Sequence, residues 1–542
     1  MKQVFLTLTL LLSLSSCSYG QGNITPAARK VNMVMYAIEN LYVDTVSSNK
    51  LAEDAIIGLL EKLDPHSSYS TPEEVKELNE PLQGNFDGIG VQFNMLTDTL
   101  YIVQVIPGGP SEKVGIQAGD RIIFVGDTLI AGVGKKNNDI VKMLRGPKGT
   151  VVNIKILRNK NPELLDFRIV RDKIPIFSMD AAYMLDKKTG YIKLNRFAAT
   201  THDEFKEAMN KLQKLGMENL ILDLQGNGGG YLNAAIDITN TFLKQGSLIV
   251  YTEGTHQRRE EAKATYKGDF TKGRLIVLVD ESSASASEIV SGAIQDWDRG
   301  VIVGRRTFGK GLVQRPIPLP DGSMIRLTTA RYYTPAGRHI QKPYEDLESY
   351  NLDLIERYNH GEMVSADSIH FPDSLIHHTL VNKRVVYGGG GIMPDYFVPL
   401  DTTKMSKIHR EINRSGLINR FTMKYVEDNR NKILNNYTTF TDYRDKFTVT
   451  EHMLNELLNM YKEDQKEKNK DKESAIELTS DDLQGFEESK SLIRMQIKAY
   501  IASDLYDRGD YYEIINAIND PLTKAFEIIN NPKEYNKLLE GK

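Results

Sequence analysis

The spacing of hydrophobic and polar residues changes along this chain, and each change marks a different kind of predicted structure. Between residues 25 and 80 the apolar positions recur at helical spacing, as in LAEDAIIGLLEKL, which predicts a small helical segment. From about 84 to 160, short apolar runs are separated by glycine turns, as in TLYIVQVI and DRIIFVGD. This texture is typical of short strands, with one helical stretch at NNDIVKMLRG before the last of them.

Residues 175 to 340 alternate predicted strands and helices, which indicates a β/α core. The run HDEFKEAMNKLQKLG is an amphipathic helix whose apolar face carries Phe205, Ala208, Met209, Leu212 and Leu215. Buried strands are predicted at NLILDL and LIVLVD, and in such sheets the loops that follow strands are the usual ligand-binding positions. After GGGGIMPDYFVPLD, residues 388 to 401, the pattern is polar and helical.

The N-terminus reads as a secretory leader. MKQVFLTLTLLLSLSSC has Lys2 and then an apolar run that ends in small residues. Leu14-Ser15-Ser16-Cys17 resembles the bacterial lipobox, in which the cysteine is lipidated and becomes the new N-terminus; the alternative is an ordinary signal peptide cut near Gly20. We favour the lipoprotein, which predicts a periplasmic protein of the bacterial cell envelope, held to a membrane only by the lipid on Cys17.

We therefore expect an α/β multidomain protein. Its predicted parts are a leader at 1–22, a helical segment at 23–83, a strand-rich domain at 84–160, a β/α core at 161–400 and a helical region at 401–542.

Composition narrows the class of function. The chain has 542 residues, 40% of them hydrophobic and 26% charged, with a formal net charge of -4. This near balance argues against nucleic-acid binding, which needs a basic surface. Cys17 is the only cysteine, so neither a disulfide nor a cysteine protease is expected. There is no HExxH motif, and His377 and His378 lack a third ligand at metal spacing, so no metal is predicted.

The stretch DESSASASEIV, residues 280 to 290, places several serines between a predicted buried strand and a predicted helix. Ser285 and Glu288 have capping-box spacing, so Ser285 could simply cap the helix. It could instead be a nucleophile, provided that a base removes its proton. Lys310 lies between Gly309 and Gly311 and could be that base if its amine is kept neutral. The alternative for Lys310 is a surface lysine in a turn.

A family resemblance distinguishes these alternatives. SASASEIVSGAIQDWDRGVIVGRRTFGKGLVQ resembles the carboxyl-terminal processing, or tail-specific, proteases, and the similarity extends from LDPHSSY to GGGGIMPD. It implies a crotonase-like or ClpP-like β/α core, no cofactor, and Ser285 as nucleophile, Lys310 as base and Gln314 as its support. It also implies an oxyanion hole, which we place at Gly228 or Gly229 together with the amide of Ala286.

The chain departs from the family pattern at two places. Gln225 stands where the usual form has an arginine, which puts a local salt bridge or loop contact in doubt. An insertion at 344–387 occupies a region that is often much shorter in the family, and we expect it to cover or extend the site.

The strand-rich domain carries a second resemblance. FDGIGV is a glycine-flanked loop that leads into a strand, so its backbone N–H groups can hold a terminal carboxylate while the strand pairs with a peptide. IPGGPSEKVGIQAGDRIIFVGD resembles the core of a PDZ domain, inserted ahead of the protease core. The expected contacts to a substrate C-terminus are Gly88, Ile89, Gly90 and Val91. The alternative is a small barrel without a ligand.

The sequence thus predicts a serine endopeptidase of the Ser–Lys type that selects protein substrates by apolar C-terminal tails. One rival is an inactive PDZ scaffold that binds C-termini without cutting them. Another is a lipoprotein adaptor whose helical tail, 402–542, is the active part. Further expected partners are another copy of the chain or an adaptor lipoprotein.

Overall fold

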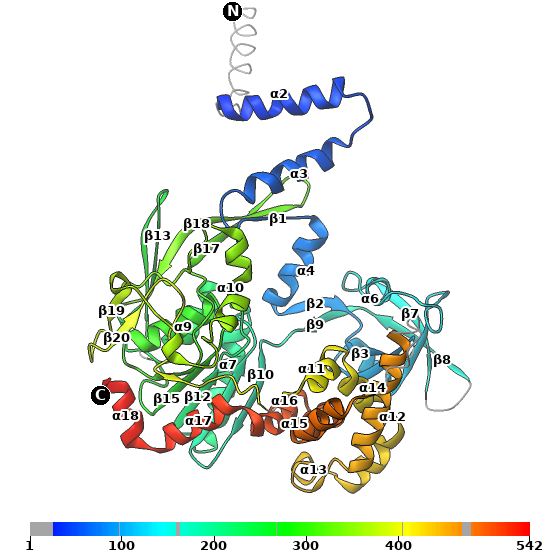
Figure 1. Ribbon diagram of the computed structural model, residues 1–542. Coiled ribbons are helices and arrows are strands. Elements are labelled where there is room, and N and C mark those ends of the chain that lie inside the picture. Colours follow the sequence, from blue (N-terminus) through cyan, green and yellow to red (C-terminus); the bar gives the residue numbers. More distant parts are fainter. Residues whose placement is uncertain are drawn as a thin grey trace, which may run out of the picture. The chain divides into compact units, whose positions relative to one another are not determined.

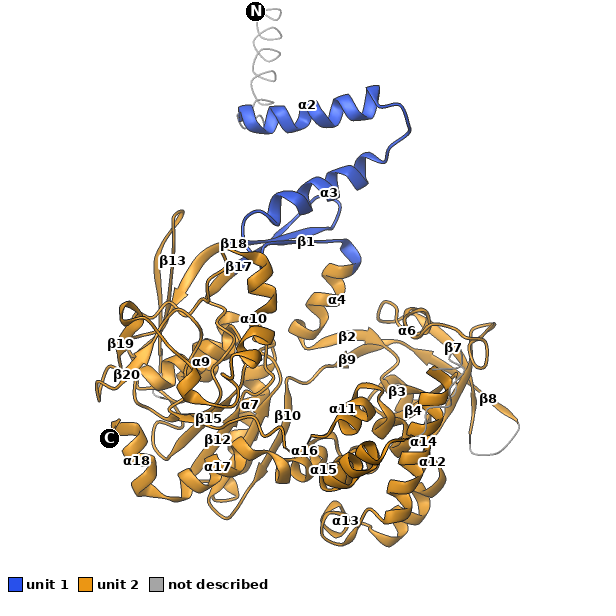
Figure 2. Ribbon diagram, viewed as in Figure 1, with its two compact units in different colours: residues 1–73, 314–328 blue, residues 74–313, 329–542 orange. Residues whose placement is uncertain are grey.

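The computed structural model describes residues 25–541, apart from 97, 159–162, 267, 404 and 469–477. The chain forms two compact units, which Figure 2 distinguishes by colour. The first contains residues up to 73 together with 314–328, and the second contains 74–313 and 329–542. Each unit is described by itself.

The first unit is small and mainly helical. It contains α2 (Pro26–Leu41), α3 (Ser48–Leu60) and β1 (Ser68–Ser70), with parts of β17 (Leu312–Pro318) and β18 (Met324–Tyr333). The helix starts follow capping rules, because Thr25 and Ser47 accept hydrogen bonds from N–H groups in the first turns of α2 and α3. β1 pairs antiparallel with residues 324–326 of β18.

The strand-rich domain of the second unit has one main sheet, in the order β3-β4-β5-β7-β8. Side chains alternate along β7, so that Val152, Ile154 and Ile156 are buried while Val151 and Asn153 are exposed. The elements of the domain are β2 (Asn85–Gly88), β3 (Val91–Leu96), β4 (Thr99–Val105), α5 (Pro110–Lys113), β5 (Arg121–Val125), β6 (Thr128–Leu129), α6 (Asn137–Leu144), β7 (Val151–Leu157), β8 (Leu164–Val170) and β9 (Asp172–Pro175).

The β/α core is built on a sheet in the order β10-β11-β12-β15-β16-β21. Only the β10–β11 pair is antiparallel; the pairs from β11 to β21 are parallel. The strands are β10 (Met179–Met184), β11 (Thr189–Leu194), β12 (Asn219–Asp223), β15 (Leu275–Val279), β16 (Val301–Gly304) and β21 (Tyr396–Phe397).

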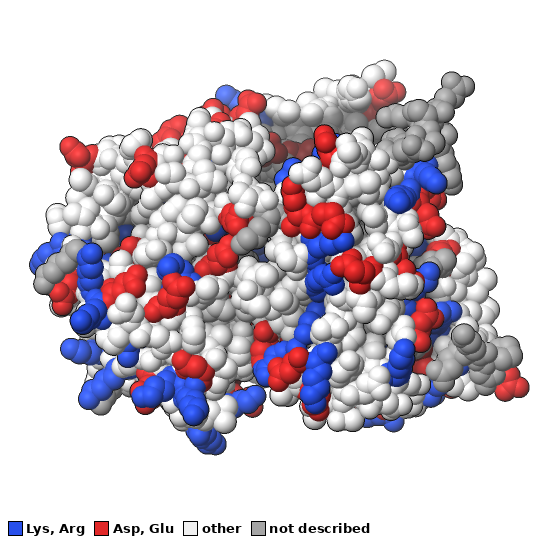
Figure 3. Space-filling view, turned by 60° about the horizontal axis from the view of Figure 1, so that its bottom comes forward, with Lys and Arg blue, Asp and Glu red and all other residues white. Residues whose placement is uncertain are grey.

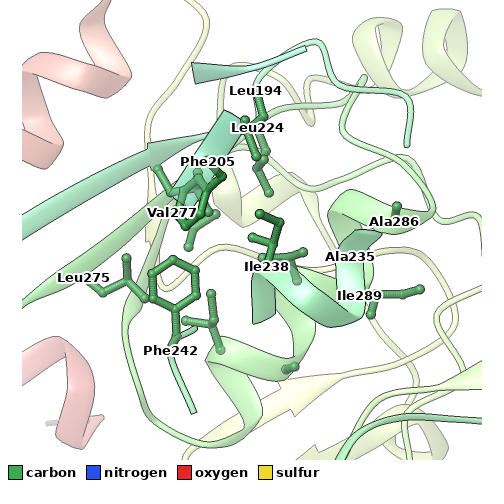
Figure 4. Close-up of a cluster of buried hydrophobic side chains, with 14 of the residues drawn as sticks. Leu194, Phe205, Leu224, Ala235, Ile238, Phe242, Leu275, Val277, Ala286 and Ile289 are labelled. Atoms are coloured by element: carbon green, nitrogen blue, oxygen red, sulfur yellow. The ribbon is translucent and has the colours of Figure 1, made fainter. Parts of the chain in front are cut away.

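Both faces of this sheet are covered, which explains why the central strands are continuous apolar runs. On one face, Leu275 and Val277 pack with side chains of α7 (Thr201–Lys214), α8 (Leu232–Asn240) and α9 (Ala286–Asp296), as Figure 4 shows. On the other face, Ile276 and Leu278 pack against α17 (Asp520–Asn530) and α18 (Pro532–Glu540). Residues near the C-terminal end of the sequence therefore complete the β/α core (Figure 1).

The remaining elements of the core lie around this sheet. β13 (Leu248–Gly254) pairs with β14 (Gln257–Lys263) and with the 331–333 end of β18. The insertion contains α10 (Leu347–Asn359), two short 3₁₀ turns and the β19–β20 hairpin (Ile376–His378 and Val385–Tyr387).

In the sequence, a helical domain separates the last core strand, β21, from α17, and it has its own apolar centre. It comprises α11 (Lys407–Arg414), α12 (Leu417–Asn436), α13 (Phe440–Lys446), α14 (Glu451–Lys468), α15 (Ser480–Leu505) and α16 (Arg508–Ile515). It contacts the strand-rich domain through an ion pair between Glu427 and Arg121, and the core through Tyr512, which donates to Asp180 at 2.8 Å.

Charged side chains of both signs are interspersed on the face of the molecule drawn in Figure 3. In the described part of the chain, no helix combines the length and the hydrophobicity that crossing a bilayer requires.

Candidate active site

Three loops of the core meet at one edge of its sheet. They follow β12, β15 and β16, which are adjacent parallel strands, so their carboxyl ends open on the same edge. The first loop contains Gly228 and Gly229, the second contains Ser285, and the third contains Lys310.

Ser285 occupies a strained position at the start of α9. Its φ is 56° and its ψ is −111°, a backbone conformation that costs a non-glycine residue on the order of 1–3 kcal/mol. The neighbouring serines make other contacts. The Ser283 hydroxyl donates to the carbonyl of Leu224, and the Ser287 hydroxyl donates to that of Asn227, both at 2.8 Å. Ser283 and Ser287 thus tie the second loop to the first, while Ser285 stands at the strained turn between them.

Glu288 joins the loops of Ser285 and Lys310. One oxygen of its buried carboxylate accepts the backbone N–H of Ser285 at 2.8 Å and that of Lys310 at 2.9 Å. The other accepts the Thr307 hydroxyl at 2.6 Å and the Gly309 N–H at 2.7 Å. Burial raises the pKa of Glu288 from 4.5 to about 7, although the four donors act in the opposite direction. Sequence spacing identified Glu288 only as a capping residue, because its contacts with the third loop are not local.

Tyr332 makes a second link between the same two loops. Its buried hydroxyl donates to the carbonyl of Ser285 at 3.1 Å and to the carbonyl of Lys310. The main chains of both residues are therefore fixed on their N–H side by Glu288 and on their carbonyl side by Tyr332. The sequence offers no local signal for Tyr332, since it acts from β18.

The glycine loop approaches Ser285 closely. A Cβ atom added to Gly229 would lie 2.8 Å from the Ser285 Cβ and 3.1 Å from the Ala286 nitrogen. Gly229 also has a φ of 103°, and its N–H donates to Asn227 Oδ1 at 2.9 Å. A Cβ on Gly228 would meet nothing within 4 Å. The glycine backbone and the start of α9 thus lie side by side, as an oxyanion hole between them would require.

Gln225, where the family pattern expects an arginine, is held by other means. Its carbonyl accepts the ammonium of Lys193 at 3.0 Å, and its side-chain oxygen accepts the amide of Asn519 at 3.2 Å. Lys193 also forms an ion pair with the buried Asp223 at 3.2 Å. The Lys193 ammonium, on β11, therefore holds the loop after β12, where the family pattern has an arginine at position 225 itself.

Gln314 belongs to the first unit, whereas Lys310 belongs to the second. The side-chain amide of Gln314 donates to the Thr328 hydroxyl at 3.4 Å, and that hydroxyl donates to Asp64 at 3.0 Å. Asp64 also accepts the Ser67 hydroxyl at 2.6 Å. These contacts anchor Gln314 within its own unit, and its support of Lys310 stays a prediction.

Gly88, Ile89, Gly90 and Val91 all line one cavity of about 120 Å³ in the strand-rich domain. Its other walls are apolar side chains of β3 and α6, including Phe93, Val141 and Leu144, together with Arg145. Arg145 lies over the ring of Phe86 at 4.5 Å and forms an ion pair with Glu80. Arg145 was not predicted as a site residue: the sequence placed it inside the helical stretch NNDIVKMLRG, whereas the helix ends at Leu144.

The predicted lipidation site, Cys17, falls outside the described residues. Within the described ranges, no group of three or more His, Cys, Asp or Glu side chains could hold a metal ion.

Three family models match separate parts of the chain: the β/α core, the strand-rich domain and the helical domain. Residues 188–347 match Peptidase family S41, residues 88–169 match the PDZ domain, and residues 408–507 match a family of unknown function, DUF8443. The chain is 37% identical over 347 residues to the carboxy-terminal-processing protease of Bartonella bacilliformis, covering 62% of this chain and 78% of that protein. It is 34% identical to the carboxy-terminal processing protease CtpA of Bacillus subtilis, covering 62% of this chain and 72% of that protein.

Among solved structures, the photosystem II D1 C-terminal processing protease is 29% identical. That match covers 58% of this chain and 90% of the other, with a TM-score of 0.33.

Proposed function

This chain belongs to the carboxy-terminal processing proteases of peptidase family S41, which are serine-type hydrolases, and on that premise we propose that Ser285 is its nucleophile and Lys310 its general base. The observation that carries the proposal is the Glu288 carboxylate, which takes the N–H groups of both residues on a single oxygen. Such a contact fixes the two loops relative to each other. Proton transfer from a nucleophile to its base depends on the distance and orientation that the loops give them. Gln314 is proposed to support Lys310.

The proposed reaction has two steps. As Ser285 Oγ bonds to the substrate carbonyl carbon, the Lys310 amine takes the hydroxyl proton; the resulting ammonium then protonates the departing amine as the peptide bond breaks. Water next adds to the acyl carbon and gives a proton to Lys310. The ester bond between this carbon and Ser285 Oγ then breaks, Lys310 returns the proton to Ser285, and the carboxylic acid leaves. Gly228 and Ala286 are proposed to donate to the oxyanion, since the Gly229 N–H is already engaged by Asn227.

The PDZ domain is proposed to select the substrate. A C-terminal peptide would pair with β3, place its last side chain in the apolar cavity, and present its carboxylate to the N–H groups of residues 88–91. Arg145, at the wall of this cavity, adds a positive charge near the expected position of the carboxylate. Protein substrates with apolar C-termini are therefore the expected class.

An unfolded reporter protein with an apolar C-terminal tail tests the reaction. The wild-type chain should cleave it, and Ser285→Ala should bind its tail but leave it intact. Ser282→Ala is the matched control, because Ser282 is an exposed serine of the same turn and should cleave normally. Unchanged cleavage by Ser285→Ala would refute the proposed nucleophile. Tail binding without cleavage by the wild-type chain would instead favour the PDZ scaffold.

We further propose that the protein is a lipoprotein of the bacterial cell envelope, anchored through Cys17. Expression with a radiolabelled fatty acid should label the wild-type chain and leave Cys17→Ala unlabelled. Labelling of both would contradict the anchor. Light scattering of the purified protein, with and without detergent, tests whether copies of the chain associate.

A further inference from the structure

The loop that carries Lys310, residues 305–311, contains no helix or strand. Its inner side is held by the core, because the Phe308 N–H donates to the Ser283 carbonyl at 3.0 Å and Glu288 accepts the N–H groups of Gly309 and Lys310. The core also holds the Lys310 carbonyl through the Tyr332 hydroxyl, and the Thr307 N–H donates to the Ile392 carbonyl at 3.1 Å. The carbonyls of Arg306, Thr307 and Gly309 have other partners. The position of the lysine therefore also depends on what packs against these three carbonyls, here called the outer side of the loop.

The outer side is occupied by the insertion, residues 344–387, most of which lies beyond the stretch that matches Peptidase family S41. Arg357 of α10 donates to the carbonyls of Arg306 at 2.8 Å and Thr307 at 3.3 Å. Its side chain is 4% exposed, and its Nε donates to Glu362 at 3.2 Å. Glu362 also accepts the guanidinium of Arg306 at 2.5 Å. One buried arginine and one carboxylate thus hold both the main chain and a side chain of the loop.

A second set of contacts restrains the loop closer to Lys310. The backbone N–H of Lys342 donates to the Gly309 carbonyl at 3.0 Å. Its ammonium lies 4.2 Å from the ring of Phe308 and 4.1 Å from that of Tyr350, and it donates to Asp353 at 2.8 Å. Tyr350 and Asp353 both belong to α10. Lys342 lies two residues before the insertion and is held by it, and the Tyr350 ring meets the Phe308 ring edge-on at a centroid distance of 6.2 Å. The insertion therefore contacts the loop at Phe308 as well as at Arg306 and Thr307.

We infer that the insertion is a positioning element for the general base, with Arg357 as its principal positioning residue. It acts through main-chain carbonyls just before Phe308-Gly309-Lys310 and needs no contact with the substrate. Because a reacting group displaced by about 1 Å can cost about 100-fold in rate, releasing this restraint should slow the chemical step. The inference rests on the proposed Ser–Lys reaction.

The test compares Arg357→Ala and Arg357→Lys with the wild-type chain on the apolar-tailed reporter. We expect Arg357→Ala to lower kcat by about 100-fold while KM and the affinity for a fluorescent tail peptide stay unchanged. Arg357→Lys keeps the charge and can make only some of the contacts, so its kcat should fall by about 10-fold. Glu362→Gln, which keeps the size of the side chain, should behave like Arg357→Lys and serves if Arg357→Ala does not fold.

Arg299→Lys is the matched control. Arg299 is a part-buried arginine that likewise donates to backbone carbonyls, those of Phe242, Phe270, Lys272 and Gly273, away from the site. Its replacement should lower Tm and leave kcat of the folded protein unchanged. Wild-type kcat in the Arg357 and Glu362 variants, or a loss that appears in KM, would overturn the inference. A wild-type chain that does not cleave would instead refute the proposed function.

Discussion

At the scale of single residues, burial and hydrogen bonding have opposite effects on the pKa of Glu288. Four hydrogen-bond donors point at its two oxygens, yet burial dominates and raises its pKa to about 7. Glutamine has the same shape but only one oxygen, so its NH₂ group would face two of the four donors. Any replacement of equal size would therefore break contacts to Ser285, to Lys310 or to the Thr307–Gly309 loop.

The first prediction concerns Glu288→Gln. We expect kcat to fall by about 100-fold, because the Ser285 and Lys310 main chains lose their common acceptor. Thr422→Val is a control for the mere removal of a buried polar group, since Thr422 lies in the helical domain away from the site. It should lower Tm without changing kcat. Normal cleavage by Glu288→Gln would contradict the role given to this carboxylate.

The same residue gives a pH prediction. A carboxyl group whose pKa is raised from 4.5 to about 7 keeps its proton in the folded state and loses it on unfolding between these values. Its contribution to the free energy of unfolding is therefore full below pH 4.5, declines as the pH rises to about 7, and is lost above it; the total is about 3 kcal/mol. Urea unfolding of Ser285→Ala protein across this range should show the decline. The double variant with Glu288→Gln should lack that part of the slope.

Gly229 gives a steric prediction. Alanine there would have to adopt a φ of 103° and bring its Cβ to 2.8 Å from that of Ser285. Gly229→Ala should destabilise the fold by about 1–3 kcal/mol and displace Ser285, lowering kcat by at least about 10-fold. Gly228→Ala, one residue away, meets nothing within 4 Å and should unfold at the wild-type temperature. Equal effects at the two positions in thermal melts would contradict this geometry.

At the scale of elements, the groove between β3 and α6 makes the PDZ hypothesis testable. Val141 on α6 lines the apolar cavity, so Val141→Lys places a charge where an apolar tail residue is expected to bind. The affinity for an apolar C-terminal peptide should fall by at least about 10-fold, with a matching rise in KM for tailed substrates. Lys142→Ala, at the exposed neighbouring position, should bind the peptide normally in the same anisotropy titration. Equal peptide affinity in Val141→Lys and wild type would contradict this groove.

Elements with strong periodicity were predictable from sequence. The face of α7 predicted from Phe205, Ala208, Met209 and Leu212 is buried, although Leu215, assigned to the same face, is exposed just beyond the helix end. The Ser–Lys assignment depended on the family resemblance, since local spacing left Ser285 as a possible cap. Contacts between distant loops were not predictable, because nothing local to Glu288 indicates that it reaches the loop of Lys310.

At the scale of the whole molecule, the helical region after residue 401 is not a single appendage. α17 and α18 cover one face of the core sheet, whereas α11 to α16 form their own apolar centre. The sequence pattern predicted a polar, helical region here, but it could not show which surface each helix covers. Removing 402–542 would therefore uncover Ile276 and Leu278, so a test of the adaptor hypothesis has to retain the last two helices.

The corresponding prediction concerns Ile528 of α17, which is fully buried in the same cluster as Ile276 and Leu278 on the sheet face that α17 and α18 cover. Ile528→Ala should lower the free energy of unfolding by about 2–5 kcal/mol and destabilise the β/α core itself. Hydrogen exchange should report this as lost protection in β12 and β15. Leu483→Ala, at an exposed position of α15, should leave that protection unchanged. Loss of protection confined to the helical domain in Ile528→Ala would contradict the placement of α17.

The position of α17 and α18 in the sequence also sets an order of events during synthesis. A ribosome makes Ser285 and Lys310 long before it makes Asp520–Asn530, and until then the outer face of the sheet has no cover. A growing chain would therefore hold both proposed catalytic residues without the packed sheet that places their loops together. Cutting activity is expected to arise late, once the covering helices have emerged, which would spare unfinished copies from attack by one another.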